Sequence, residues 1–445
     1  MRDRDLRCSR RKFLASAAAL TLAGGIPPNG SAAEAASTSG FRARAAKPGR
    51  EGRIPIAVIT TVYRPMSHAY HIAGRFLHGY GRDGQLHVPK QYVASLYVDQ
   101  TPDNDLSRVM SREFDFRLAG SIADALTNGT DKLTVDGVLL VGEHGNYPRN
   151  DKGQILYPRF EMLEQITNVF RKVGRSVPVF NDKHLSHDWE KAKKMAGWAA
   201  ELKFPLMAGS SLPVTWRRPE LELALATPIE DGLVAAYGPI EVYGFHALET
   251  LQVMMERRKG SETGVKAVTC LTGKDVWKAG DAGRWSWDLL EAALGRSESL
   301  NPGDIRRNVG GLAVQAMPAT PATAFLVDYR DGTRGTALLL NGHIQDFCFA
   351  AKIKNEAKPV SCLFHLPPPP GAKYFDCLTA NIEKLFETGK TPYPLKRTLL
   401  TTGALAAGME SHYRRGTAVE TPELEIRYSA PADSGFMRGS VAAPV

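Results

Sequence analysis

The sequence predicts an α/β protein in which a doubly wound parallel sheet precedes a second, α+β domain with a largely antiparallel sheet. From Ile54 to residue 212, short apolar runs alternate with segments of helical periodicity. Beyond Pro213 the apolar runs become longer, which marks a second domain. Regular alternation of strand and helix is typical of parallel sheets with right-handed crossovers.

The elements of the first domain follow from apolar runs that end in polar or glycine-containing turns. Residues 135–141, VDGVLLV, are largely apolar, as strands covered on both faces are. The other strands are expected at Ile54–Thr61, Tyr92–Val98, Val177–Phe180 and Pro205–Ala208. Helices are expected at Ser67–Tyr80, Leu106–Glu113, Ile122–Leu126, Phe160–Val173 and Trp189–Leu202.

The second domain is expected to contain longer strands. They are predicted at Gly232–Tyr237, Gly264–Thr272, Ala322–Asp328 and Thr336–Asn341. Helical patterns at Ala247–Arg257 and Cys377–Glu387 are expected to cover one face of this second sheet. The proline run Pro367–Pro370 interrupts the chain ahead of the last helices.

The N-terminus has the pattern of a twin-arginine secretory signal. The stretch Ser9–Leu14, SRRKFL, precedes an apolar run at Ala15–Ala23 that is too short to span a bilayer, and small residues follow. This pattern predicts recognition by the twin-arginine translocase and a periplasmic location; a basic amphipathic arm is the alternative. The resulting division is a signal peptide at 1–36, a disordered linker at 37–52, a Rossmann-like domain at 53–212 and a C-terminal domain at 213–445.

The positive charge of the chain belongs mainly to these N-terminal segments. Of a formal net charge of +9, residues 1–36 carry +3 and residues 37–53 carry +4, which leaves +2 for the remainder. The folded part therefore lacks the basic excess typical of nucleic-acid-binding proteins, and no nucleic acid partner is expected. Four cysteines follow the signal without metal-binding spacing, and both disulfides and buried thiols remain open for them: Cys270, Cys348, Cys362 and Cys377.

One candidate site begins where a predicted strand ends. The strand in the stretch VPVFNDKHLS is followed by Asp182, Lys183 and His184. In open α/β sheets, ligands bind beyond the carboxyl ends of the strands, so these side chains are expected to face a crevice. A lysine there can hydrogen-bond a substrate hydroxyl group. The alternative is that Asp182 caps the next helix and Lys183 is solvated.

Two further stretches contain residues suited to chemistry. In EVYGFHALE, a helix start places His246 between Gly244 and Glu249, although an isolated histidine there is often structural. In LVGEHGNYP, Gly142 follows a strand, and a glycine permits close approach of a ligand to the backbone. A plain turn explains the second stretch equally well.

Together these stretches resemble the glucose–fructose oxidoreductase and inositol dehydrogenase (Gfo/Idh/MocA) family over nearly everything after residue 53. Where that family has Glu-Lys-Pro with a substrate-contacting lysine, this chain has Asp182-Lys183-His184. The family's Gly-x-His-x-x-Asp stretch, which contains its usual acid/base histidine, is matched by 244–249. The segment LFETGKTP at 385–392 is similar to the family's last helix and turn.

The resemblance implies an oxidoreductase that acts on a sugar or cyclitol with NAD or NADP. It assigns catalysis to Lys183 and His246, with Asp182, His184 and Glu241 as substrate-binding residues. No resident metal is expected. A homo-oligomer is compatible with the sequence, which does not indicate a subunit number.

The chain departs from the family at its nucleotide-binding loop. The family's Gly-x-Gly-x-x-Gly allows the backbone to approach a pyrophosphate, but the aligned positions here are Thr60, Val62 and Pro65. Pro65 also removes an N–H donor. If a dinucleotide is bound, its ligands are expected to include Thr60, Thr61, Arg64, Asp99 and Gly142, with Tyr63 and Ser67 as further donors.

Three hypotheses for function therefore remain. The first is an exported oxidoreductase with a tightly bound nicotinamide cofactor. The second is a non-redox carbohydrate-binding protein that has lost dinucleotide binding. The third is a metal-dependent lyase or hydrolase, because His68 and His71 lie one helical turn apart. Its further candidate ligands are Glu143, His144, Asp182, His184 and His187.

Overall fold

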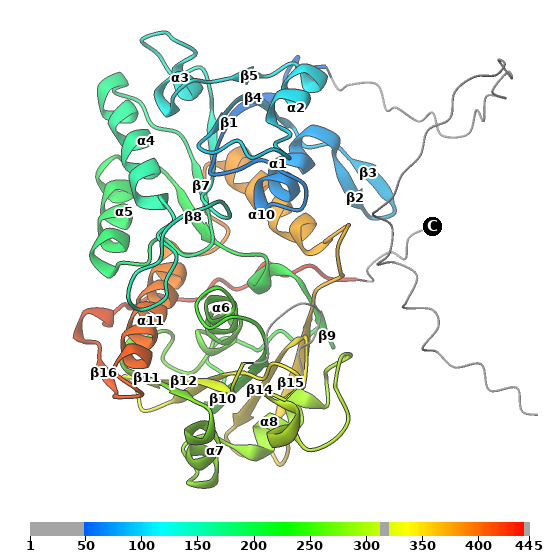
Figure 1. Ribbon diagram of the computed structural model, residues 1–445, viewed down its shortest axis with the longest axis vertical. Coiled ribbons are helices and arrows are strands. Elements are labelled where there is room, and N and C mark those ends of the chain that lie inside the picture. The colour runs from blue at the N-terminus through cyan, green and yellow to red at the C-terminus, as the bar shows by residue number, and fades with distance from the viewer. Residues whose placement is uncertain (1–48, 312–319, 440–445) are drawn as a thin grey trace, which may run out of the picture. The chain divides into compact units, whose positions relative to one another are not determined.

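The computed structural model describes residues 49–311 and 320–439 (Figure 1). The expected signal peptide and all but the last residues of the expected linker lie outside these ranges. The described residues contain two large sheets, each with helices packed on it, which confirms the predicted fold class. Among the described residues, no helix combines the length and apolar character needed to cross a membrane.

The first sheet is entirely parallel, with the strand order β5-β4-β1-β6-β7-β8. Its strands are β1 (Ile54–Thr60), β4 (Gln91–Val98), β5 (Arg117–Leu118), β6 (Gly137–Val141), β7 (Val179–Asp182) and β8 (Leu206–Gly209). A small hairpin, β2 (Tyr80–Arg82) and β3 (Gln85–His87), stands apart from it. The order reverses at β1, as in doubly wound sheets, so polar residues after β1, β6 and β7 gather at one edge.

Two cores cover the two faces of this sheet, and β1 shows how the sequence divides between them. Ile56 and Val58 belong to one core, whereas Ala57 and Ile59 belong to the other, as the period of two in a strand requires. The helices are α1 (His68–His78), α2 (Ser107–Phe114), α3 (Ile122–Thr127), α4 (Arg159–Val173) and α5 (Trp189–Glu201). Helix α1 begins after Ser67, whose side chain accepts a hydrogen bond from the Tyr70 N–H.

The second sheet has eight strands in the order β16-β11-β12-β13-β10-β14-β15-β9. All its pairs are antiparallel except β10 with β13. The strands are β9 (Trp216–Arg218), β10 (Ile229–Ala236), β11 (Val265–Thr272), β12 (Thr323–Tyr329), β13 (Arg334–Leu339), β14 (Phe347–Ile353), β15 (Val360–His365) and β16 (Val419–Glu420).

The helices of the second half cover both faces of this sheet. On one face, α6 (Val242–Met255) and α11 (Leu395–Tyr413) share a core with alternate strand residues. On the other, α8 (Trp287–Leu294) packs beside α7 (Lys274–Asp281). The short elements are α9 (Ile305–Asn308), η2 (Leu212–Val214) and η3 (Pro422–Leu424). The four cysteines after the signal are buried and unpaired among the described residues.

One helix lies on the opposite sheet from the one predicted. The segment Cys377–Glu387 was expected on the second sheet, but α10 (Tyr374–Thr388) packs beside α1 on the first (Figure 1). Ile382 and Phe386 share a core with Ile56, and a Cβ on Gly137 would lie 2.7 Å from the Phe386 ring. A helical pattern identifies the buried face of a helix but not the surface that buries it, which is why the prediction was wrong.

Candidate active site

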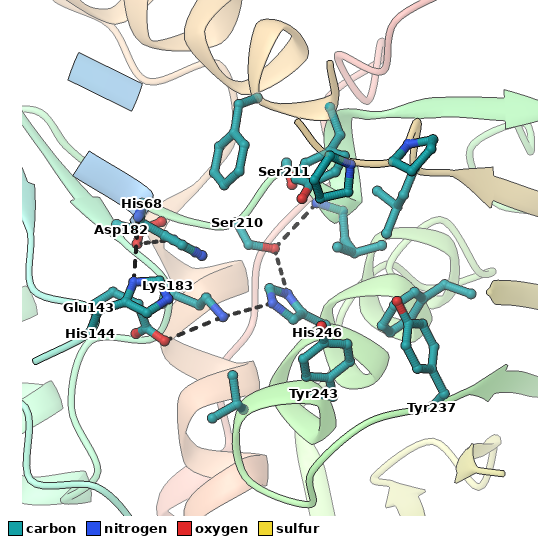
Figure 2. A pocket seen from close by; sticks show the side chains of 18 of the residues that line it. His68, Glu143, His144, Asp182, Lys183, Ser210, Ser211, Tyr237, Tyr243 and His246 are labelled. Atoms are coloured by element: carbon teal, nitrogen blue, oxygen red, sulfur yellow. Dashed lines mark hydrogen bonds and ion pairs between the residues drawn. The ribbon is translucent and has the colours of Figure 1, made fainter. Parts of the chain in front are cut away.

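A cavity of about 430 Å³ lies where the carboxyl ends of β6, β7 and β8 meet the start of α6 (Figure 2). Most of its polar lining follows strands of the first sheet or lies on α1 and α6, and its aromatic lining comes from α6, α10 and the second sheet. The residues that line it are His68, Glu143, His144, Asp182, Lys183, Ser210, Ser211, Leu212, Tyr237, Val242, Tyr243, His246, Gln345, Phe347, Leu366, Pro368, Pro369, Tyr374 and Phe375.

Lys183 and His246 meet in this cavity. Lys183 directly follows β7 with a left-handed backbone (φ 69°), and its N–H donates to the Gly209 carbonyl at 3.0 Å. Its Nζ lies 2.8 Å from His246 Nε2, on the second turn of α6. The structure thus brings together the two residues that the sequence nominated, while their catalytic role stays a prediction.

A buried carboxylate balances the lysine charge. Glu143 follows β6 and forms ion pairs with Arg159 and, at 3.7 Å, with Lys183 Nζ. Burial alone would raise the pKa of Glu143, but Lys183 and Arg159 together hold that pKa well below its usual value. Glu143 is therefore ionised, and it anchors the ammonium group at the wall of the cavity.

On its other side, His246 is linked to a serine and a second glutamate. His246 Nδ1 lies 3.0 Å from Ser210 Oγ, and Ser210 donates both its hydroxyl and its N–H to Glu249. Burial, and then the charge of Lys183, lower the pKa of His246 well below its usual value. A neutral imidazole that accepts from Lys183 at Nε2 carries its hydrogen on Nδ1, and we assign this tautomer from the hydrogen-bond network.

Asp182 is engaged by a histidine from a different element. Its side chain is fully buried, and its Oδ2 lies 2.6 Å from Nδ1 of His68, the first residue of α1. The sequence suggested His68 only as a metal ligand. The main-chain N–H of His68 is itself 3.4 Å from Nδ1 of His144.

The other two predicted substrate-binding residues lie outside the cavity lining. His184 is buried with Nε2 3.2 Å from Arg159 Nη1. Glu241 accepts a hydrogen bond of 2.9 Å from the Ile155 N–H, and burial raises its pKa to about 7. Both side chains support the walls of the site, and the structure does not bring them to the cavity.

The predicted nucleotide ligands are dispersed. The hydroxyls of Thr60 and Thr61 are buried and donate to the carbonyls of Val141 and Glu143 at 2.9 and 2.7 Å. The half-buried Arg64 precedes α1, whereas Asp99 is exposed and accepts a hydrogen bond of 2.6 Å from the Tyr147 hydroxyl. At Gly142, a Cβ would come within 2.7 Å of Arg159 Cγ, so this glycine makes room for an arginine.

The turn between β1 and α1 does not fit a pyrophosphate bound at a helix N-terminus. Such binding requires free main-chain N–H groups. Here the N–H groups of Arg64 and Tyr70 donate to Ser67 Oγ, and that of His68 donates to His144. Pro65 has no N–H group. The residues of this turn therefore do not form the phosphate cradle that a dinucleotide uses in this type of fold.

The metal hypothesis also lacks a suitable group of ligands. Among residues 49–311 and 320–439, no three or more His, Cys, Asp or Glu side chains are arranged to hold a metal ion. His68 is bound to Asp182, while His71 stacks on Phe375 with ring centroids 5.0 Å apart.

Several residues of the site were missed from sequence. Ser210 and Ser211 follow β8 just as Lys183 follows β7, so the binding of ligands beyond the carboxyl ends of strands could have identified them. The aromatic wall had no comparable signal, because Phe347 is about a hundred residues away in sequence from Tyr237 and Tyr243. It consists of Tyr237, Tyr243 and Phe347, whose ring centroids lie 5.1 to 6.1 Å apart.

Solved structures share this fold at low sequence identity. GenD2 from gentamicin A biosynthesis, in complex with NAD, matches with a TM-score of 0.51 and 13% identity over 89% of this chain and 99% of that one. The myo-inositol dehydrogenase from Lactobacillus casei, in complex with NAD(H) and myo-inositol, gives 0.50 and 9% over 83% and 96%. An oxidoreductase from Agrobacterium radiobacter, in complex with NAD+, L-tartaric acid and magnesium, gives 0.50 and 12% over 83% and 98%.

These comparisons confirm the predicted resemblance at the level of the fold, which is that of the oxidoreductases named above. No model of a known protein family matches the chain, and no curated protein matches it in sequence.

Proposed function

We propose that this chain, built on an oxidoreductase fold, binds a sugar or cyclitol in the cavity and that Lys183 and His246 together hold and deprotonate one of its hydroxyl groups. The 2.8 Å contact between Lys183 Nζ and His246 Nε2 carries this proposal. Both side chains are nearly buried and both line the cavity. A substrate hydroxyl that replaces this direct contact accepts a hydrogen bond from the ammonium group and donates to the imidazole.

The charge of Lys183 acts on both sides of this proton transfer, because it disfavours the imidazolium and favours the alkoxide. A neutral His246 is ready to accept a proton, and the lysine charge stabilises the alkoxide that forms. The Nδ1–H of the resulting imidazolium faces Ser210 Oγ, and Nδ1 lies 3.8 Å from Glu249 Oε2. Burial raises the pKa of Glu249 to about 7. Near neutral pH its carboxylate can therefore accept a proton from the imidazolium by way of the Ser210 hydroxyl.

The aromatic wall supports a ring-shaped polyol as the ligand. Sugars and cyclitols present apolar C–H faces as well as hydroxyl groups, and pockets for such ligands combine aromatic surface with a few fixed polar groups. Tyr237, Tyr243 and Phe347 provide that surface beside His246, whose ring centroid lies 5.7 Å from that of Tyr243 and 6.2 Å from that of Phe347. The ion pair with Glu143 holds the Lys183 ammonium group in place, and the hydrogen bond to Ser210 holds the His246 imidazole.

The engaged N–H groups of the β1–α1 turn favour the non-redox form of this proposal. The second candidate is an oxidoreductase with NAD or NADP, favoured by the fold shared with NAD-bound GenD2. Such an enzyme needs a dinucleotide held away from that turn. Export by the twin-arginine translocase to the periplasm is a further part of the proposal, supported by SRRKFL and the apolar run after it.

Ligand binding to matched variants tests the proposal. Calorimetric titration with myo-inositol, glucose and glucuronate is expected to give binding that Lys183→Met weakens by about 10- to 100-fold, since a hydrogen bond to a charged group is worth about 1.5–3 kcal/mol. The exposed Lys172→Met serves as the control and is expected to bind normally. Equal affinity in Lys183→Met, or no binding of any of the three, contradicts the proposal.

Native mass spectrometry separates the two candidates. Protein purified from the cytoplasm of its own host is expected to have the mass of the polypeptide alone. A stoichiometric increase equal to one nicotinamide dinucleotide would replace the non-redox form by the oxidoreductase.

A further inference from the structure

We propose that His68, oriented by Asp182, is a second acid–base group of this cavity and that it removes a proton from a substrate carbon adjacent to a carbonyl or carboxylate group. The substrate class is then a keto sugar or a sugar acid. This inference rests on the proposed function, because it requires a sugar in the same cavity. It adds a residue and a reaction that Lys183 and His246 do not supply.

The first support is the geometry of the two side chains. His68 Nδ1 lies 2.6 Å from Asp182 Oδ2, and the Asp182 side chain has no exposed surface. Its other oxygen, Oδ1, is buried without a hydrogen-bond partner among the described residues. His68 is thus the one side chain bound to this carboxylate in the described structure. A buried carboxylate on Nδ1–H leaves the lone pair on Nε2, the tautomer that a general base requires.

The second support is the direction of the ring. The His68 side chain is 17% exposed and lines the cavity. Figure 2 shows its ring directed into the cavity from the Asp182 side. Phe375 holds the ring edge-on at 5.1 Å between centroids, and the His144 ring lies at the same distance. Ring contacts and the carboxylate together fix the orientation that proton abstraction needs.

The third support is the position of His68 in the fold. It occupies the first residue of α1, directly after a turn in which the N–H groups of Arg64 and Ser67 are bound and Pro65 has none. An acid–base group therefore stands where this type of fold otherwise binds a dinucleotide phosphate. Proton transfer at carbon needs no hydride acceptor, so the presence of this group agrees with the absence of a phosphate cradle in the described turn.

The reaction balances without a redox partner. His68 Nε2 takes the proton from the carbon that bears a hydroxyl next to the carbonyl group. The C–H electron pair forms a carbon–carbon double bond, and the carbonyl oxygen becomes an oxyanion that the Lys183 ammonium stabilises. Return of the proton to the same face of that carbon gives exchange, and delivery of a solvent proton to its other face gives epimerisation. Isomerisation also requires the proton of the neighbouring hydroxyl to pass to the former carbonyl oxygen, a transfer for which Lys183 and His246 are in place, before His68 returns its proton to the former carbonyl carbon.

The tautomer of His68 is the first test, and it needs no substrate. In protein labelled with 15N-histidine, the signal that His68→Gln removes is expected to show hydrogen on Nδ1 and none on Nε2 at neutral pH. In Asp182→Ala the same signal is expected to show a mixture of tautomers. Hydrogen on Nε2 in the wild-type protein would overturn the inference.

The second test is uptake of deuterium from D2O by fructose and glucuronate, followed by proton NMR. We expect exchange at the carbon next to the carbonyl or carboxylate group of at least one of them. Because His68→Gln has no general base at this position, the variant is expected to exchange about 10²- to 10⁴-fold more slowly than the wild type. The matched control is His71→Gln, one turn along α1 and outside the cavity lining, which is expected to exchange at the wild-type rate.

The outcomes distinguish this inference from the proposed function. Binding without exchange, or unchanged exchange in His68→Gln, removes the role of His68 and leaves the sugar site intact. Failure of the wild-type protein to bind any probe removes both. Loss of exchange in His68→Gln with retained affinity for the same sugar, measured by calorimetry, supports both.

Discussion

Replacement of Glu241 by glutamine is expected to change how stability depends on pH. Glu241 is 4% exposed, and its carboxylate accepts the Ile155 N–H at 2.9 Å. Burial raises its pKa from 4.5 to about 7. A glutamine of the same shape keeps an oxygen for the Ile155 N–H but has no proton to lose. The substitution therefore removes the titration and preserves the hydrogen bond.

The sign and size follow from the two pKa values. Below pH 4.5 the Glu241 carboxyl group is protonated in both the folded and the unfolded state, so burying it requires no proton uptake and the folded state is most stable with respect to this group. As the pH rises toward 7, the unfolded chain releases the proton while the folded chain retains it, and this stability is lost. The interval between 4.5 and about 7 corresponds to about 3 kcal/mol of unfolding free energy.

Urea-induced unfolding at pH 4 and pH 8 measures this difference. Relative to the wild type, Glu241→Gln is expected to gain about 3 kcal/mol between the two pH values. The exposed Glu164→Gln controls for general charge effects and is expected to follow the wild type. Parallel curves for the wild type and Glu241→Gln would refute the argument, because they would mean that the folded carboxyl group titrates like an exposed one.

Two further substitutions test the close packing of Gly142 against Arg159 and the buried ion pair between Arg397 and Glu256. Gly142→Ala places a Cβ within 2.7 Å of Arg159 Cγ and is expected to cost about 1–3 kcal/mol of unfolding free energy, measured by urea titration. Arg397→Met leaves Glu256 buried without its bidentate partner and is expected to cost about 3–5 kcal/mol. The exposed Arg171→Met is expected to cost less than about 1 kcal/mol, and equal losses in both arginine variants would contradict this account.

Much of the fold could be predicted because each strand and helix signals itself locally. The apolar run around β6 and the serine before α1 are properties of neighbouring residues. The partner of a helix is not a local property. The same apolar face of α10 could have packed on either sheet, and only the position of Phe386 against Gly137 in three dimensions decides between them.

The site divides in the same way. Lys183 could be nominated because it follows a strand, and His246 because its neighbours match a family pattern. The bond between His68 and Asp182 joins residues 114 positions apart, so no spacing in the sequence could reveal it. Glu241 was nominated for the ligand, but its hydrogen bond to Ile155 turns it away from the cavity. The edge of the sheet is thus encoded locally in the sequence, whereas the side-chain pairings depend on the three-dimensional fold.

The place of α10 has a consequence for the order of folding during synthesis. The sheet that the first 212 residues form has one face only partly covered, by α1, until Tyr374–Thr388 leaves the ribosome. Until then, Ile56 and Val58 on β1 and Phe76 on α1 lack their covering helix. A nascent chain that stops before α10 is therefore expected to be a substrate for chaperones and not an independently stable unit, even though its own strands and crossovers are complete.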